Sequence, residues 1–184
     1  MGGPKPGSSE FNAFVIAMDI FSDKQYLEVR TNNGLSYAPQ AFFVGGLTPY
    51  TVLRVSTTNP DKYVSVMDQL IAKTHSGGFS AEEVKNSKMG YMTGFYSKIE
   101  TNAAQAASLA ANEILFNDWK CSLRINEDLK KVSAGDVDKA FNKYVQEITW
   151  VFQGDTSKVN SALYTAMPVN SKLPDSKVSN GTKN

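Results

Sequence analysis

Apolar residues in the first part of the chain recur every three or four positions, which is the spacing of one helix face. The run 9–30 carries six such side chains: Phe11, Phe14, Val15, Met18, Phe21 and Val29. Ser8 or Ser9 is a suitable N-cap, and Glu10 places negative charge in the first turn, where the helix dipole favours it. We therefore predict a long helix from about Ser9 to Arg30. Its apolar face is wide, so we expect it to be covered on more than one side.

Three segments show the alternation of apolar and polar residues that is typical of a strand. They cover 35–44, 50–57 and 148–152. Pro39 cannot donate a backbone hydrogen bond, so the first segment is expected at a sheet edge or at a bulge. The Gly- and Pro-containing segment 45–49 predicts a hairpin loop between the first two strands.

Helical spacing returns between the second and third strands, together with capping signals. Asn59 precedes Pro60 at a helix start, and Ser80 with Glu83 forms a capping box. The predicted helices cover about 60–76, 80–99, 103–116, 125–132 and 133–144. The alanine-rich helix among them, 103–116, is expected to approach another helix or the sheet closely. The element order predicts an α+β fold with a small, mainly antiparallel sheet covered by helices on one face.

The chain of 184 residues is long enough for one domain with a substantial core. We expect that domain over 9–166, with 1–8 as a loop remnant and 167–184 as a flexible, polar tail. The net charge of +1 gives no basic field, which argues against a nucleic-acid partner. No run approaches the roughly 18 apolar residues that span a bilayer, and 1–9 does not have the pattern of a signal peptide.

The residues that usually carry catalysis are nearly absent from the sequence. His75 is the only histidine, and neither HxxEH nor HExxH occurs, whereas a catalytic zinc site needs about three protein ligands. We expect His75 to be solvated at a helix end. Cys121 is the only cysteine and lies near Trp119 and Leu123, which predicts a buried, inert thiol. We therefore expect no catalytic residue, no metal ligand and no cofactor in this chain.

One segment at the first helix-to-strand junction stands out. Arg30 and Tyr37 flank a short turn that contains Gly34, so a cation and a phenol are held side by side. A purely structural interpretation is available: Arg30 would cap the helix C-terminus, where a cation is favoured, and Tyr37 would pack on the sheet.

From about Phe11 to Asp155 the chain resembles the C-terminal, non-metal half of the pitrilysin/insulinase family of zinc peptidases. The resemblance rests on the order and spacing of several segments: Leu27-Glu-Val-Arg30, Asn33-Gly-Leu-Ser-Tyr37-Ala38, Gly78-Phe-Ser-Ala-Glu-Glu83, Leu129-Lys-Lys-Val-Ser-Ala-Gly-Asp-Val137 and Trp150-Val-Phe-Gln-Gly-Asp155.

This resemblance implies half of a clamshell whose other half carries HxxEH and zinc. It also implies that Arg30 and Tyr37 are substrate-binding residues that face the peptide across from the metal. On this interpretation the chain is a non-catalytic, substrate-positioning half-domain, inactive without an HxxEH-bearing partner domain or subunit. The resemblance is also compatible with an exported or periplasmic parent protein.

The chain departs from the family pattern at its start. A family domain begins with a strand before the long helix, and Met1-Gly-Gly-Pro4 resembles only the stub of that strand. We therefore expect a truncated domain with an unpaired sheet edge that promotes self-association. Two alternatives stay open: a non-catalytic scaffold or interaction protein of the same fold, and an inert truncated fragment.

Overall fold

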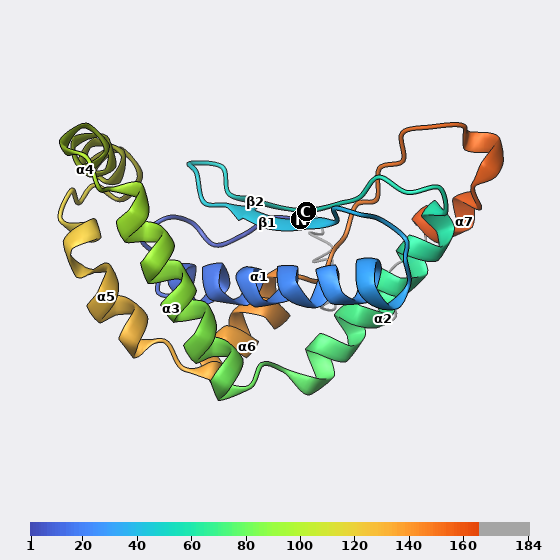
Figure 1. Ribbon diagram of the computed structural model, residues 1–184, viewed down its shortest axis with the longest axis horizontal. Coiled ribbons are helices and arrows are strands. Elements are labelled where there is room, and N and C mark those ends of the chain that lie inside the picture. Colours follow the sequence, from blue (N-terminus) through green and yellow to red (C-terminus); the bar gives the residue numbers. More distant parts are fainter. Residues whose placement is uncertain (166–184) are drawn as a thin grey trace, which may run out of the picture.

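The first helix lies along one face of a two-stranded antiparallel sheet, and the other helices are arranged around it (Figure 1). The structure is a computed structural model that describes residues 1–165, so the predicted tail lies outside the described residues. The elements in chain order are α1 (Phe11–Tyr26), the π-helix η1 (Leu27–Asn32), β1 (Gln40–Val44), β2 (Tyr50–Arg54), α2 (Pro60–Gly77), α3 (Ala81–Lys98), α4 (Asn102–Phe116), α5 (Cys121–Lys131), α6 (Ala134–Tyr144), the 3₁₀-helix η2 (Thr156–Lys158) and α7 (Ser161–Thr165).

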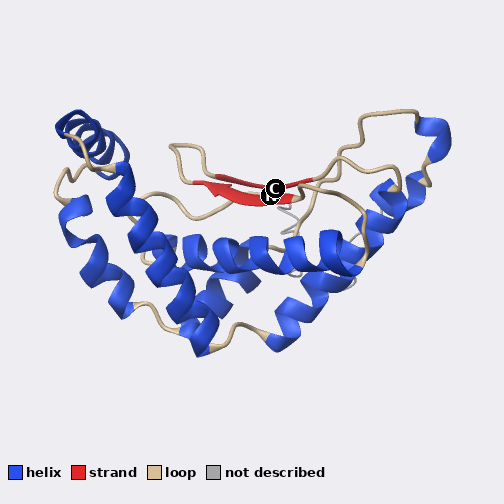
Figure 2. Cartoon of the chain, in the orientation of Figure 1, coloured by secondary structure: helices blue, strands red, loops and turns tan. Residues whose placement is uncertain are grey.

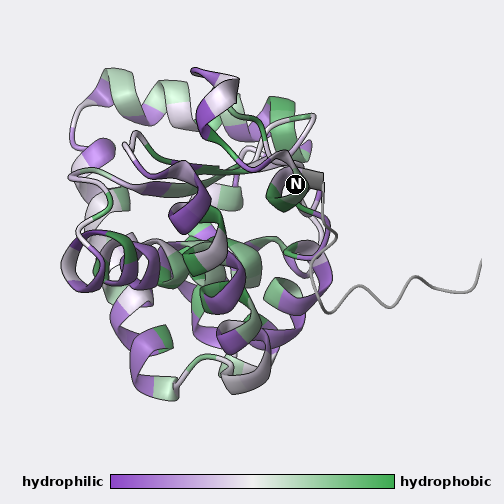
Figure 3. Cartoon of the chain, turned by 90° about the vertical axis from the view of Figure 1, so that its right-hand side faces the viewer, coloured by the Kyte–Doolittle hydropathy of each residue, from purple (hydrophilic) through white to green (hydrophobic). Residues whose placement is uncertain are grey.

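Helix α1 is the centre of the core, as its wide apolar face predicts. Its buried side chains point in several directions: Ala13, Phe14, Ile16, Ala17, Met18, Ile20 and Phe21. On the sheet side, the Phe14 ring lies 5.0 Å from the ring of Phe43 in β1. On the other side, Phe21 packs against Phe141 of α6 at 5.1 Å. In Figure 3 the hydrophobic stretches gather toward the middle of the molecule.

The sheet is a hairpin in which Gln40 lies opposite Arg54 and Val44 opposite Tyr50. Within residues 1–165 the helices lie on one side of this hairpin or beyond its ends, and α1 is directly beneath it (Figure 2). The predicted α+β class, with a small antiparallel sheet covered by helices on one face, is therefore confirmed.

The predicted third strand is wrong. Residues 148–152 form no strand, although the predicted alternation persists in their burial: Ile148, Trp150 and Phe152 are half-buried, and Thr149 and Val151 are exposed. The Trp150 ring packs 6.0 Å from the Tyr63 ring of α2. Because the segment is held by its side chains, it keeps the periodicity of a strand without pairing its backbone with β1 or β2.

The N-terminal residues run along part of the outer edge of β2. Gly2 lies opposite Tyr50 in an isolated antiparallel bridge, and the Thr51 backbone N–H donates to the Met1 carbonyl at 2.9 Å. The Thr51 hydroxyl adds a bond to the Gly2 carbonyl at 3.0 Å. The segment predicted to be a strand stub thus pairs at the beginning of β2, so this part of the edge is not free.

Local capping signals are confirmed at α2, α3 and α6. The Asn59 side chain accepts from the Lys62 N–H, and both Ser80 and Ser133 form reciprocal capping boxes. The expected cap of α1 is wrong, because its N-cap is Glu10 and no side chain caps that end. The Glu10 carboxylate instead accepts hydrogen bonds from Lys143 and Tyr144 of α6.

Helix α4 differs from the expectation of close packing. None of its residues is buried, and its main neighbour is α5. It lies at one end of the molecule, away from the sheet (Figure 1). Its alanines are therefore explained by helix propensity rather than by close approach to another element.

Candidate functional site

The junction that carries Arg30 is built by an unusual continuation of α1. The helix passes directly into the π-helical turn η1, and Gly34 then ends it with a φ of +59°. The Gly34 N–H donates to the Arg30 carbonyl at 3.1 Å, and the Leu35 N–H donates to the Val29 carbonyl at 2.9 Å. A positive φ favours glycine, which explains the residue at this position. Single π-helical turns within helices are frequent at functional sites.

Arg30 and Tyr37 lie together, as the sequence predicts. The Arg30 guanidinium carbon is 4.0 Å from the centroid of the Tyr37 ring and 5.0 Å from that of the Tyr26 ring. The guanidinium also donates a hydrogen bond to the Tyr26 hydroxyl. The cation is therefore held between two aromatic rings, an arrangement that contributes about 0.5–1 kcal/mol per contact at exposed sites.

Both rings face solvent. Tyr37 is 77% exposed and Tyr26 is 43% exposed, whereas Arg30 is half-buried between them. Tyr37 therefore does not pack on the sheet. This excludes the part of the purely structural interpretation that gave Tyr37 a packing role there. Tyr26 is the member of the site that sequence reasoning missed. Its position four residues before Arg30 on a helix was the available signal, because such side chains lie on one face.

No carboxylate neutralises Arg30 in the described part of the chain. The nearest acidic residue in sequence, Glu28, accepts hydrogen bonds from the side-chain amides of Asn32 and Asn33 at 2.9 and 3.0 Å. Asn33 also bonds the Glu28 carbonyl at 3.0 Å, so this cluster fixes the turn. Among residues 1–165 Arg30 forms no ion pair.

A buried polar contact supports the junction from beneath. Gln25 is fully buried, and its Nε2 donates to the Tyr63 hydroxyl of α2 at 3.1 Å. Burial raises the pKa of Tyr63 well above its usual range, so the phenol stays protonated. The Gln25 carbonyl oxygen has no hydrogen-bond partner in the described structure. This contact connects the Arg30 end of α1 to α2.

His75 has a structural position rather than the solvated one that we expected. It is half-buried, its Nε2 donates to the Val145 carbonyl at 2.7 Å, and its Nδ1 lies 2.5 Å from the Asn142 side-chain oxygen. The ring also packs 5.2 Å from Phe141. Because both ring nitrogens are engaged, His75 connects α2 to α6 and is not placed as a metal ligand.

Residues 1–165 contain no group of three or more His, Cys, Asp or Glu side chains that could hold a metal ion. The described side chains therefore do not fit a zinc ion. In the same part of the chain, no helix combines the length and apolar character that a bilayer crossing requires.

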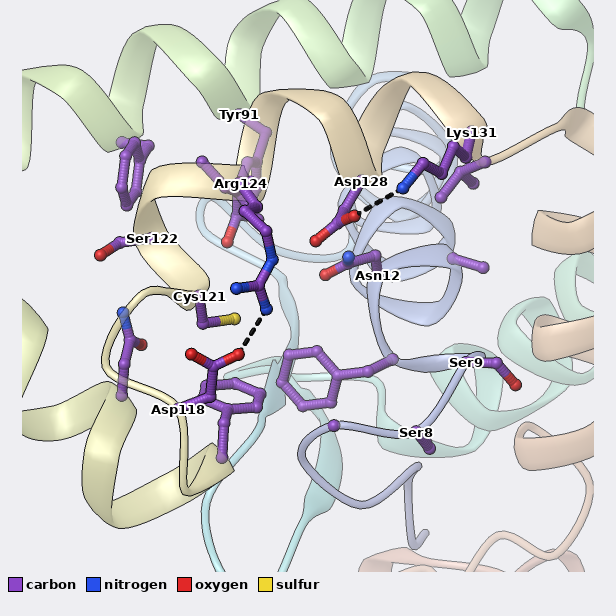
Figure 4. Close-up of a pocket in the computed structure, with 18 of the residues that line it drawn as sticks. Ser8, Ser9, Asn12, Tyr91, Asp118, Cys121, Ser122, Arg124, Asp128 and Lys131 are labelled. Carbon is purple, nitrogen blue, oxygen red and sulfur yellow. Dashed lines mark hydrogen bonds and ion pairs between the residues drawn. The ribbon is translucent and has the colours of Figure 1, made fainter.

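Cys121 lies at a cavity of about 600 Å³ between the start of α1 and helices α3, α4 and α5. Figure 4 shows its thiol beside the ion pair of Arg124 and Asp118. Burial raises the pKa of the Cys121 thiol, and that effect outweighs the influence of Arg124. A raised pKa keeps the thiol protonated at neutral pH, which makes it a poor nucleophile. The predicted burial is wrong, because Cys121 is half-buried and its neighbours Trp119 and Leu123 are exposed.

In comparisons with known proteins, no family model and no curated protein sequence matches the chain. Solved structures do match. The inactive peptidase domain of a proposed zinc protease from Bordetella parapertussis is 18% identical with a TM-score of 0.66, over 78% of this chain and 80% of that one. A peptidase M16 inactive domain from Pseudomonas fluorescens is 16% identical with a TM-score of 0.66, over 78% of this chain and 36% of that one.

The periplasmic protease PqqL from Escherichia coli also matches, at 11% identity and a TM-score of 0.65. The match covers 78% of this chain and 17% of PqqL, so the chain spans a small part of that larger protein. The protein thus has the fold of the inactive domain of M16 zinc peptidases, which confirms the fold that the pitrilysin/insulinase resemblance implied.

Proposed function

We propose that this chain is a non-catalytic half-domain of an M16-type zinc peptidase and that it positions peptide substrates for an HxxEH-bearing partner. The observation that carries the proposal is the contact of a half-buried Arg30 with the exposed Tyr37 ring at 4.0 Å, with no described carboxylate paired to Arg30. The fold shared with inactive M16 domains supports the same assignment.

The pair suits the recognition of peptide carbonyl groups. A guanidinium has five N–H donors and no acceptor, and a phenol O–H adds one more donor. An extended peptide presents carbonyl oxygens that accept such bonds. Because the cation is already held between Tyr26 and Tyr37, less side-chain entropy is lost when a peptide binds.

The partner domain would hold the zinc ion and supply the hydrolytic chemistry. Arg30 and Tyr37 would contribute donors on the opposite side of the peptide, where they fix its register. Donors that reach the scissile carbonyl would also stabilise the oxyanion that develops during hydrolysis. Closure of two halves around one peptide would exclude water from the site.

A scaffold or interaction role is the alternative, and it predicts a different environment for Arg30. A scaffold would be expected to use Arg30 in a structural ion pair, and none is described for it. Tyr37 likewise faces solvent and is not part of the core. These observations favour substrate positioning over the scaffold.

The test is reconstitution with an HxxEH-bearing half, assayed by cleavage of a quenched fluorescent peptide. We expect activity only in the mixture. Arg30→Ala and Tyr37→Phe should each lower kcat/KM about tenfold, or about 1.4 kcal/mol, whereas Arg54→Ala at the exposed end of β2 is the matched control.

The outcomes separate the alternatives. Variants that stay within about threefold of the unmodified mixture, below about 1 kcal/mol, would contradict substrate positioning. If the halves co-purify and are active but the Arg30 and Tyr37 variants have no effect, the chain acts as a scaffold. Halves that neither co-purify nor cleave the peptide would indicate an inert fragment.

A further inference from the structure

Helices α3 and α5 lie side by side, at the opposite end of α1 from the Arg30 junction (Figure 1). Between them is a surface groove of about 730 Å³. Its floor is apolar and includes Val84, Met89, Met92, Leu129 and Val132. The groove shares no lining residue with the site at Arg30 and Tyr37, so it is a separate surface.

The charged side chains that line this groove all have one sign. Its lining residues include the three cations Lys85, Lys88 and Lys130 and no acidic side chain. The Lys130 ammonium lies 2.8 Å from Glu127, but both side chains are more than 60% exposed, so that ion pair is weak and replaceable. Two other carboxylates lie nearby, and both line the neighbouring cavity: Asp128 pairs with Lys131, and Asp136 accepts a hydrogen bond from Ser133.

The remaining two lysines keep charge available to a ligand. The Lys85 ammonium makes no ion pair within residues 1–165. Lys88 donates to the Val132 carbonyl and also lies near the Asp136 carboxylate, whose pKa is lowered by hydrogen bonds from Ser133 and by Lys88, so the charge of Lys88 is partly compensated. Ammonium groups on two helices therefore flank one apolar floor.

The floor contains two methionines, one of which is exposed. Met89 is 54% exposed and Met92 is half-buried against the core. Methionine side chains are flexible and polarizable, and they are common where a surface accepts varied apolar side chains. An apolar patch with a polar rim is typical of a protein interaction site.

We propose that the α3–α5 groove binds an acidic, apolar-faced peptide segment of a partner protein. Apolar side chains of that segment would rest on Met89 and Met92, and its carboxylates would pair with Lys85, Lys88 and Lys130. Charge complementarity argues against this chain's own residues 167–184 as the occupant, because they contain three lysines and one aspartate.

The test uses the full chain and a labelled synthetic peptide of about four helical turns, with leucine on one face and glutamate on the other. We expect saturable binding that weakens as salt is added. A second peptide with lysine in place of glutamate should bind at least about tenfold more weakly. Fluorescence anisotropy measures both affinities.

Two kinds of variant separate the charged rim from the floor. Lys85→Glu with Lys130→Glu should weaken binding at least about tenfold and remove most of its salt dependence. Lys62→Glu on α2 makes one such charge reversal elsewhere and should have no effect. Met89→Ser should weaken binding without changing the salt dependence. Thermal unfolding of each variant confirms that it is folded.

Several results would overturn the proposal. They are equal affinity for the acidic and basic peptides, equal effects of the rim variant and the Lys62→Glu control, and no saturable binding of the acidic peptide. Binding to vesicles of anionic lipid without binding to the peptide would assign the same groove to a membrane surface instead.

Discussion

The buried contact between Gln25 and Tyr63 offers the sharpest test of the energetics. Gln25 is 0% exposed and Tyr63 is 4% exposed, and a single hydrogen bond of 3.1 Å joins them. The Gln25 carbonyl oxygen is the buried side-chain atom without a partner in the described structure. Tyr63→Phe and Gln25→Met remove one polar group each, and the double variant removes both.

The expected magnitudes follow from counting unpaired groups. Tyr63→Phe leaves the whole amide of Gln25 without a partner, which should cost about 1–3 kcal/mol. Gln25→Met removes the unpaired carbonyl but leaves the Tyr63 hydroxyl without a partner. These two effects on the free energy of unfolding should nearly cancel. The double variant loses only a bond worth about 0.5–1.5 kcal/mol net and also removes the unpaired carbonyl. It should therefore be more stable than Tyr63→Phe by about 1–3 kcal/mol.

Urea unfolding followed by tryptophan fluorescence measures this cycle. Trp150 is a local reporter because its ring lies 6.0 Å from the Tyr63 ring. Equal denaturant slopes across the four proteins would show that only stability has changed. If the two single effects add to within about 0.5 kcal/mol, Gln25 and Tyr63 are not energetically coupled and the reasoning is refuted.

Two further predictions concern a glycine and a carboxylate. Gly78 has a φ of +66°, and a Cβ there would lie 2.8 Å from the Asp138 carboxylate, whereas Gly34 has a φ of +59° and open space. Gly34→Ala should therefore lower the free energy of unfolding by about 1–2 kcal/mol, and Gly78→Ala should lower it clearly more. Thermal unfolding measures both. Equal losses would show that the Asp138 side chain moves aside freely. Burial raises the pKa of Glu83, but Lys24 at 2.7 Å and the capping bonds outweigh it and lower that pKa below the ordinary 4.5. A lowered folded-state pKa gives stability above the unfolded-state value that is lost as pH falls through the folded-state value. Glu83→Gln should therefore make the free energy of unfolding fall less steeply as the pH drops below about 5. Urea midpoints measured over this range check the prediction. A midpoint that falls as steeply as in the unmodified protein would contradict it.

The elements predicted from sequence were those that depend on neighbours within about four residues. The capping boxes at Ser80 and Ser133 are local, and both are confirmed. The missing third strand and the cap of α1 depend on distant partners. Residues 148–152 are held by α2, and Glu10 is engaged by Lys143, which is 133 positions away. No periodicity in a single segment contains that information.

In the candidate site, too, contacts between residues close in sequence were predictable and contacts that depend on other partners were not. Arg30 and Tyr37 are seven positions apart across a glycine turn, so their contact was predictable from the sequence. The absence of a described carboxylate at Arg30 was not, because it depends on how Asn32 and Asn33 occupy Glu28. The role of His75 was also hidden, since its partners lie about 70 residues further along the chain.

The exposed position of helix α4 affects local unfolding of the molecule. Because none of its residues is buried and its main neighbour is α5, little apolar surface is exposed when it separates from the rest. A helix of 15 residues is marginal alone, so its amides should exchange with solvent while those of α1 stay protected. Hydrogen exchange in α4 would therefore report on anything that covers this end of the protein, without requiring global unfolding.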